Sequence, residues 1–112
     1  TPLTDSEYHA KAMAVLGSVE AAIDRYLQGD VVDIDTSRTG GLLELAFPNG
    51  SKIVLNTQPP LHELWMAARA GGYHYKYVDG RWLDREGAEF FEALSRCASE
   101  QAGVALRFSP PA

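Results

Sequence analysis

Hydrophobic residues recur every three or four positions near the start of the chain, which is the spacing of one face of an α-helix. The positions are Tyr8, Ala12, Val15, Leu16, Val19, Ile23 and Tyr26. Asp5 and Ser6 stand before this stripe as candidate capping residues, and Gly29 stands after it. The pattern predicts a helix of about six turns that ends near Gly29.

The spacing then changes to alternation, which is typical of β-strands. From Val32 we expect a half-exposed strand, with one face made of Val32, Ile34 and Thr36 and the other of Asp33, Asp35 and Ser37. Apolar residues alternate again over 43–47, and Asn49-Gly50 leads into residues 52–56, which are apolar at 53–55. Because an Asn-Gly pair accepts the positive φ of a tight turn, this segment predicts a hairpin.

The second half of the chain contains one ambiguous segment. Residues 61–69 have helical propensities, but they form a short run between Pro59-Pro60 and Gly71-Gly72, so helix and strand stay equally open. Residues 73–78, a turn at Asp79-Gly80 and residues 81–83 predict another hairpin. A final helix follows, marked by Phe90, Leu94, Cys97 and Ala98 and fading after Gly103.

This order of elements predicts an α+β fold. We expect a two-layer sandwich over residues 1–112, a single domain in which both terminal helices pack on one face of an antiparallel sheet. The first helix and the first strand would then border each other at one edge. The chain has 112 residues, enough for one hydrophobic core, and no stretch approaches the roughly 20 apolar residues of a membrane span.

The cysteine content excludes several kinds of site. Cys97 is the only cysteine, so the chain cannot form an internal disulfide or hold a thiolate zinc site or an iron–sulfur cluster by itself. Its place on the apolar face of the last helix favours a small core residue over a reactive thiol. Residues 1–4 show no basic targeting segment, and we expect a cytoplasmic protein.

The net charge of −5 makes nucleic-acid binding improbable, because a phosphate backbone would be repelled. All the excess lies in residues 1–48, which hold eight acids and three bases, whereas residues 49–112 hold seven of each. Five carboxylates gather at the junction of the first helix and the first strand. We call this set the acidic patch: Glu20, Asp24, Asp30, Asp33 and Asp35.

Three interpretations of the acidic patch are open. Carboxylates are hard oxygen ligands, so the patch could form an open and weak site for Mg²⁺, Ca²⁺, Mn²⁺ or iron ions. It could also be a solvated face that aids solubility, or a docking surface for a basic partner protein. Trp65 is similarly open: it is either a core residue or, among the amides of Asn56 and Gln58 on an exposed sheet, an interface anchor.

Other candidate motifs fail or stay weak. His62-Glu63 begins like the zinc-protease motif HExxH, but Met66 stands where the second histidine would be. His9 and His74 are interpreted as surface histidines, with metal or haem ligation as the alternative. The glycine pairs lack the lysine of a phosphate loop, and no spacing suggests a nucleophilic triad. We therefore expect no enzymatic activity.

Several motifs in one order make the chain resemble the frataxin family, in its bacterial branch. They span nearly the whole sequence: DSEYH at 5–9, GGLL at 40–43, PNGSKIVLNTQPPLHELW at 48–65, GGYHY at 71–75 and WLDREG at 82–87. The resemblance implies a helix–sheet–helix sandwich in which residues 61–68 form a strand. It also implies a role in iron–sulfur cluster assembly, as an iron donor or adaptor or as a regulator, with Fe²⁺ or Fe³⁺ held weakly by acidic residues of the first helix and strand.

The resemblance also implies partners and residue roles. The partners are a cysteine desulfurase and an iron–sulfur scaffold protein. The bacterial member of the family is described as slowing the cluster assembly that these two proteins carry out. Glu20, Asp24, Asp33 and Asp35 match the acidic positions of the family, Asp30 lies in a variable turn, and Asn56, Gln58 and Trp65 match the sheet surface used for partner contact. We expect a monomer, with metal-dependent association as the alternative.

The acidic region is thinner here than in related bacterial chains. Ala21 and Arg25 stand where those chains carry acids, and Leu27, Val31 and Ser37 lie in a region that is usually more acidic. The alternative function is a purely protein-binding regulatory module for which iron is incidental. Ferroxidase activity is the one enzymatic alternative.

Overall fold

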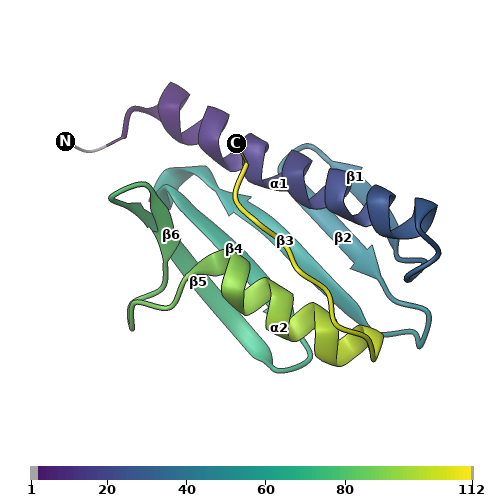
Figure 1. The fold of residues 1–112 in the computed structure, drawn as a ribbon. Coiled ribbons are helices and arrows are strands. Elements are labelled where there is room, and N and C mark those ends of the chain that lie inside the picture. Colours follow the sequence, from purple (N-terminus) through teal and green to yellow (C-terminus); the bar gives the residue numbers. More distant parts are fainter. Residues whose placement is uncertain (1–2, 112) are drawn as a thin grey trace.

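The computed structural model describes residues 3–111 and contains one sheet layer and one helix layer (Figure 1). The helices are α1 (Asp5–Gln28) and α2 (Phe90–Ala102), with a short 3-10 helix η1 (Pro59–Leu61). The strands are β1 (Asp35–Thr39), β2 (Leu42–Ala46), β3 (Lys52–Gln58), β4 (Glu63–Ala68), β5 (Gly71–Val78) and β6 (Arg81–Leu83). The predicted α+β sandwich is confirmed. No helix in the described range is long and apolar enough to cross a membrane.

The sheet is an antiparallel meander in which every strand pairs with its neighbour in the chain, in the order β1-β2-β3-β4-β5-β6. Both predicted hairpins are present, at β2–β3 and β5–β6. Most of the ambiguous segment forms β4, as the family resemblance implied, but the strand begins at Glu63 and not at Leu61. Leu61 ends η1, and His62 follows it with a positive φ of 52°, which separates the two elements. The helical propensities of the segment are overridden because Leu64 and Met66 bury themselves against the helix layer as alternate residues of a strand.

The first strand differs from its prediction. It begins at Asp35 rather than at Val32, and all five of its residues are exposed. Ile34 is buried but lies just before the strand. The alternation of residues 32–37 therefore placed one apolar residue in the core correctly, but Asp33 belongs to the connection between α1 and β1, because pairing with β2 begins only at Asp35 and Ala46.

The core lies between the two layers. The apolar stripe predicted for the first helix is buried from Tyr8 to Ile23, and alternate residues of the strands face it, among them Leu45, Leu55 and Tyr75. Thr4 and Glu7 form a reciprocal capping box at the start of α1, one residue earlier than the predicted cap. Cys97 is buried as expected, and burial raises the pKa of its thiol, which favours the protonated form.

The C-terminal segment after Gly103 runs between the two helices (Figure 1). It contributes Leu106 and Phe108 to the core, and both side chains are buried. Ser99 of α2 accepts a hydrogen bond from the amide of Leu106, and Ser95 accepts one from the amide of Phe108. This segment therefore closes the groove that the two helices would otherwise leave open.

Candidate functional site

The acidic patch lies where α1, the connection 29–34 and β1 meet. Glu20 is not free: it pairs with Arg38 of β1, which confirms that the first helix borders the first strand. The strand register places Arg38 opposite buried Leu43, on the helix side of the sheet. A half-exposed pair of this kind contributes less than about 1 kcal/mol, but it neutralises one of the five carboxylates.

The other four members of the patch make no ion pair with any residue of 3–111. Asp24 accepts a hydrogen bond from the side-chain amide of Gln28, one turn later. Asp30 has a positive φ of 57° in the turn after α1. Asp33 and Asp35 are exposed. The patch thus keeps four accessible carboxylates, although Arg25 lies within the same stretch of helix.

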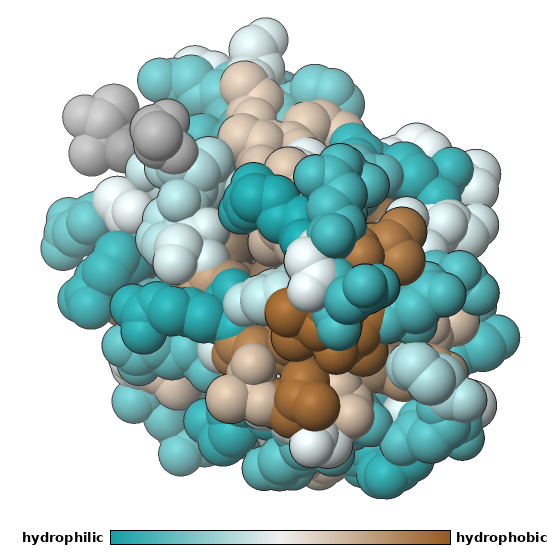
Figure 2. Space-filling view, turned by 45° about the vertical axis from the view of Figure 1, so that its right-hand side comes forward, coloured by the Kyte–Doolittle hydropathy of each residue, from teal (hydrophilic) through white to brown (hydrophobic). Residues whose placement is uncertain are grey.

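The carboxylates do not converge on one point. Among residues 3–111, no three histidine, cysteine, aspartate or glutamate side chains are close enough together to hold a metal ion. Figure 2, which turns this end of the molecule forward, shows hydrophobic residues between the hydrophilic ones. Leu27 and Val31, which stand in the thinned acidic region, are 47% and 46% exposed. The arrangement suits a cation that keeps most of its water, not one enclosed by protein ligands.

The face of the sheet opposite the helices, which we call the outer face, carries the second candidate site. Paired positions run across it in a row: Asn56 lies opposite Trp65, and Trp65 lies opposite His74. Gln58 is two residues beyond Asn56 on the same strand and therefore shares this face. The three residues expected to contact a partner are thus brought together, and Trp65 is half-buried on the surface and not part of the core.

Trp65 is held in one orientation by its neighbours. Its ring stacks on that of His74, with ring centroids 4.0 Å apart and planes 7° from parallel. Its indole N–H donates a hydrogen bond of 2.7 Å to Oε1 of Glu63. The other oxygen of Glu63 lies 3.1 Å from Nζ of Lys76 on the next strand. A fixed aromatic ring on an open sheet loses little conformational freedom on binding, which favours an interface role.

The same contacts shift the titration of Glu63. The hydrogen bond from Trp65 lowers the pKa of this carboxyl below its ordinary value of 4.5, partial burial opposes the shift, and Lys76 lowers the pKa further. A lowered pKa means that the ionised carboxylate stabilises the fold above pH 4.5. That contribution is lost as the pH falls through the lowered pKa.

Replacing Trp65 with phenylalanine should therefore raise the pKa of Glu63, because the indole donor is lost while a ring remains. We expect a higher titration midpoint for the Glu63 side-chain carboxyl carbon in an NMR pH series, and a smaller loss of melting temperature between pH 6 and pH 3. Val78→Ala, at an exposed position of β5, serves as the control. An unchanged midpoint would show that the indole hydrogen bond does not hold Glu63 ionised.

The histidines have different surroundings. His62 stacks on Tyr8 with centroids 4.7 Å apart, and its Nε2 lies 2.7 Å from Oδ1 of Asp5. This contact joins the start of α1 to the residue before β4, so His62 is engaged within the fold, in keeping with the rejection of the HExxH motif. His9 and His74 are exposed, as predicted.

The contacts of three residues at these sites were not predicted from the sequence. Arg38, His74 and Glu63 contact site residues only through pairing or packing of separate elements. A signal for His74 exists in retrospect: Trp65 and His74 are equally distant from the turn at Arg69 and Ala70, which joins β4 to β5. The sequence offers no comparable signal for Arg38, because its partner is on a helix 18 residues away.

The chain was compared with known families and proteins. A family model described as a frataxin-like domain matches residues 1–104. The chain belongs to the frataxin family. Iron-sulfur cluster assembly protein CyaY from Burkholderia mallei (strain SAVP1) is 51% identical over 108 residues, which cover 96% of this chain and 99% of the relative. The protein of the same name from Burkholderia pseudomallei (strain 668) matches equally well.

Solved frataxins share the fold. Frataxin from Psychromonas ingrahamii, described as a model for stability in the CyaY family, aligns with a TM-score of 0.85 and 34% identity, covering 96% of this chain and 99% of that one. Yeast frataxin aligns with a TM-score of 0.75 and 21% identity, covering 90% and 85%. The family and the fold that the sequence motifs implied are therefore both confirmed.

Proposed function

We propose that this protein acts in iron–sulfur cluster assembly as a non-catalytic regulator that binds iron weakly and slows the cysteine desulfurase and its scaffold. The observation that carries the proposal is the combination of two separate surfaces in one small fold. The acidic patch offers hard oxygen ligands and negative charge, and the outer face offers an ordered tryptophan among polar side chains. The relatives named for iron–sulfur cluster assembly match this protein over almost their whole length and almost the whole length of this chain.

The acidic patch supports iron binding of low affinity. Asp24, Asp30, Asp33 and Asp35 supply carboxylates without ion pairs in the described range, and such ligands suit Fe²⁺ and Fe³⁺. A trimeric frataxin from Saccharomyces cerevisiae, 18% identical with a TM-score of 0.70, is known in a ferrous complex. With Glu20 paired to Arg38 and no cluster of three ligands in residues 3–111, the iron would remain exposed and exchangeable.

The two surfaces support different roles in partner binding, one in attracting the partner and the other in specific contact. Negative charge on the patch would attract and orient a basic surface of the desulfurase, since charge chiefly raises the rate of encounter. Trp65, Asn56 and Gln58 would then provide specific contact with the assembly machinery, because a buried aromatic anchor contributes more to affinity than charges at the rim. We place this function in the bacterial cytoplasm.

Removing charge from the patch should raise stability in the absence of metal. Two carboxylates about 7 Å apart repel by roughly 0.6 kcal/mol in water. We expect the pair Asp33→Asn and Asp35→Asn to raise the melting temperature by roughly 2–5 °C. Anaerobic Fe²⁺, and also Ca²⁺, should raise the melting temperature of the unmodified protein, because a ligand bound only to the folded state stabilises it. The melting temperature of the double variant should rise less, because two of the carboxylates that would bind the metal are gone.

The control is a second pair that removes the same charge elsewhere. Glu86→Gln and Glu100→Gln change two exposed carboxylates outside the patch. This pair should leave the response to Fe²⁺ unchanged. If the two pairs respond to metal identically, the patch is not the iron site.

A second candidate function is a protein-binding module for which iron is incidental. The ion pair between Glu20 and Arg38 favours it, because it uses one carboxylate of the patch internally and links helix to strand without metal. The two candidates differ in a reconstituted assembly reaction that contains desulfurase, scaffold, cysteine and iron. The regulator slows cluster formation in an iron-dependent way, whereas the module slows cysteine desulfuration equally with and without iron. Faster cluster formation would contradict both.

A further inference from the structure

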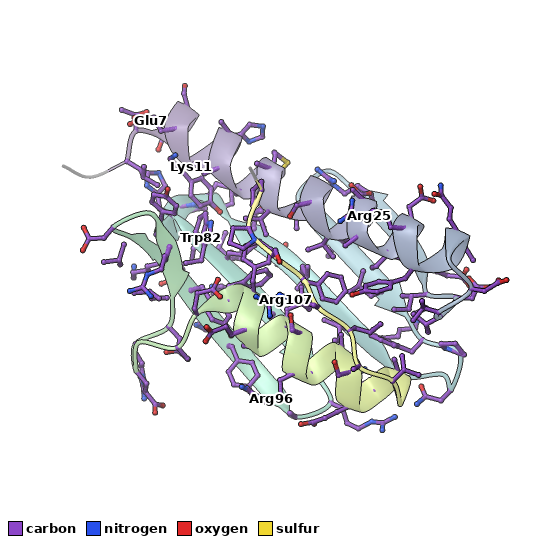
Figure 3. All side chains as sticks on the ribbon, in the orientation of Figure 1. Glu7, Lys11, Arg25, Trp82, Arg96 and Arg107 are labelled. Carbon is purple, nitrogen blue, oxygen red and sulfur yellow. The ribbon has the colours of Figure 1, made fainter. Side chains whose placement is uncertain are left out.

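A cavity of about 410 Å³ opens away from both surfaces described above. It lies between the first half of α1, the β5–β6 hairpin, the start of α2 and the end of the C-terminal segment. Figure 3 shows Lys11 of α1 and Trp82 of β6 at this end of the molecule. No member of the acidic patch lines the cavity, and neither does Trp65. Its volume falls within the roughly 300–1,000 Å³ of small-molecule sites.

The cavity is lined largely by aromatic and other apolar groups. Tyr77, Trp82 and Phe91 lie along it, and Trp82 meets the edge of Tyr77 with centroids 5.3 Å apart. Pro110 and Pro111 of the C-terminal segment contribute to the wall. Trp82 and Phe91 are buried, whereas Tyr77 and the two prolines keep accessible surface. Their rigid rings offer flat surfaces that change little on binding, and such surfaces are complementary to a flat aromatic ligand.

Two cations at the cavity have no ion-pair partner within residues 3–111. They are Lys11, whose Nζ lies 4.9 Å from the ring centroid of Tyr77, and Arg81 in β6. Two carboxylates also line the cavity, but Glu89 accepts hydrogen bonds from the amides of Phe91 and Glu92 at the start of α2. Both oxygens of Glu89 are therefore engaged by backbone amides, although this carboxylate keeps its charge. The lining thus carries two positive and two negative groups, and only one of the carboxylates, that of Glu92, accepts no hydrogen bond from the start of α2.

We propose that this cavity binds a small organic anion with a flat aromatic body. The ring system packs against Tyr77, Pro110 and Pro111, and the acidic group pairs with Lys11 and Arg81. The size and the apolar lining select a molecule of one to three rings, and the unpaired cations select a carboxylate or sulfonate over a neutral or cationic compound. This site is independent of the proposed iron and partner surfaces.

The test uses two probes that share their rings and differ in charge. One is 1-anilinonaphthalene-8-sulfonate, an aromatic anion, and the other is N-phenyl-1-naphthylamine, which lacks the sulfonate. With the folded protein, the anion should bind saturably with one molecule per chain. In ¹⁵N NMR spectra the indole N–H signal of Trp82 should shift, while that of Trp65 stays in place.

The double variant Lys11→Gln and Arg81→Gln should weaken binding of the anion by at least about tenfold and that of the neutral probe by less than about twofold, because only the charge-assisted contacts are lost. The matched control is Arg85→Gln with Arg96→Gln, two exposed arginines outside the cavity. Melting curves establish that both variants are folded. Equal weakening of both probes, an equal effect of the control pair, a shift of Trp65 in place of Trp82, or the absence of saturable binding would each overturn the proposal.

Discussion

Replacing Trp65 with alanine is expected to weaken binding to the partner of the outer face, the cysteine desulfurase or its scaffold, by about 30-fold or more. The expectation follows from the fixed position of this ring. It stacks on His74 and donates a hydrogen bond to Glu63, so its orientation is set before the partner arrives. Truncating an ordered tryptophan at the centre of an interface typically removes about 2 kcal/mol or more. Isothermal titration calorimetry with the purified partners measures the change.

Two controls make the result specific to this surface. Val78→Ala removes apolar area from an exposed position near the edge of the sheet and should change affinity by less than about threefold. The iron titration of Trp65→Ala should match that of the unmodified protein, because Trp65 lies on the outer face whereas the patch lies at the junction of α1 and β1. If iron and partner binding fall together, the two surfaces are not separable and the proposed difference in their roles is wrong.

Replacing Phe108 with alanine is expected to destabilise the fold by about 3 kcal/mol and to lower the melting temperature by roughly 10–15 °C. Phe108 is only 3% exposed, and its ring meets the edge of Tyr26 with centroids 6.2 Å apart. Removing it would leave a cavity between the two helices and would loosen the C-terminal segment that Ser95 holds. Thermal and urea unfolding followed by circular dichroism measure the loss.

The neighbouring residue supplies the control for Phe108. Arg107 is exposed, and its backbone exchanges hydrogen bonds with the hydroxyl of Tyr26, which an alanine substitution would keep. Arg107→Ala should therefore change the melting temperature by less than about 2 °C. A melting temperature for Phe108→Ala equal to that of the control would mean that the segment after residue 103 contributes little to the core. The region matched by the family model ends at residue 104, so this packing lies almost wholly beyond it.

The acidic patch illustrates the limit of reading charge from a sequence. Five carboxylates in 16 residues could be counted in the chain, and four remain free of ion pairs within residues 3–111. Whether these carboxylates converge on one point could not be predicted, because the distance between a helix and a strand depends on how the two pack. Glu20 pairs with Arg38 and not with Arg25, which is nearer in the sequence. One base from outside the cluster therefore changes the net charge of the acidic patch.

Local patterns in the sequence were sufficient to determine most of the elements of this protein. The stripe of α1, the hairpin turn at Asn49-Gly50 and the alternation in β2 and β3 act over a few residues, and each segment folds in the structure as its own spacing indicates. The start of β1 and the choice of strand for residues 63–68 needed more. A strand exists only where a neighbour completes its hydrogen bonds, and that neighbour is distant in the chain.

Only the tertiary structure decided which residues from different elements contact one another. It placed His74 against Trp65 through strand register, drew Glu20 to Arg38, and laid the segment with Phe108 between the helices. The physical reason is the range of the interactions. Hydrophobic period and turn chemistry are properties of neighbouring residues, whereas stacking, ion pairing and groove filling join residues that only the packed layers bring within contact distance.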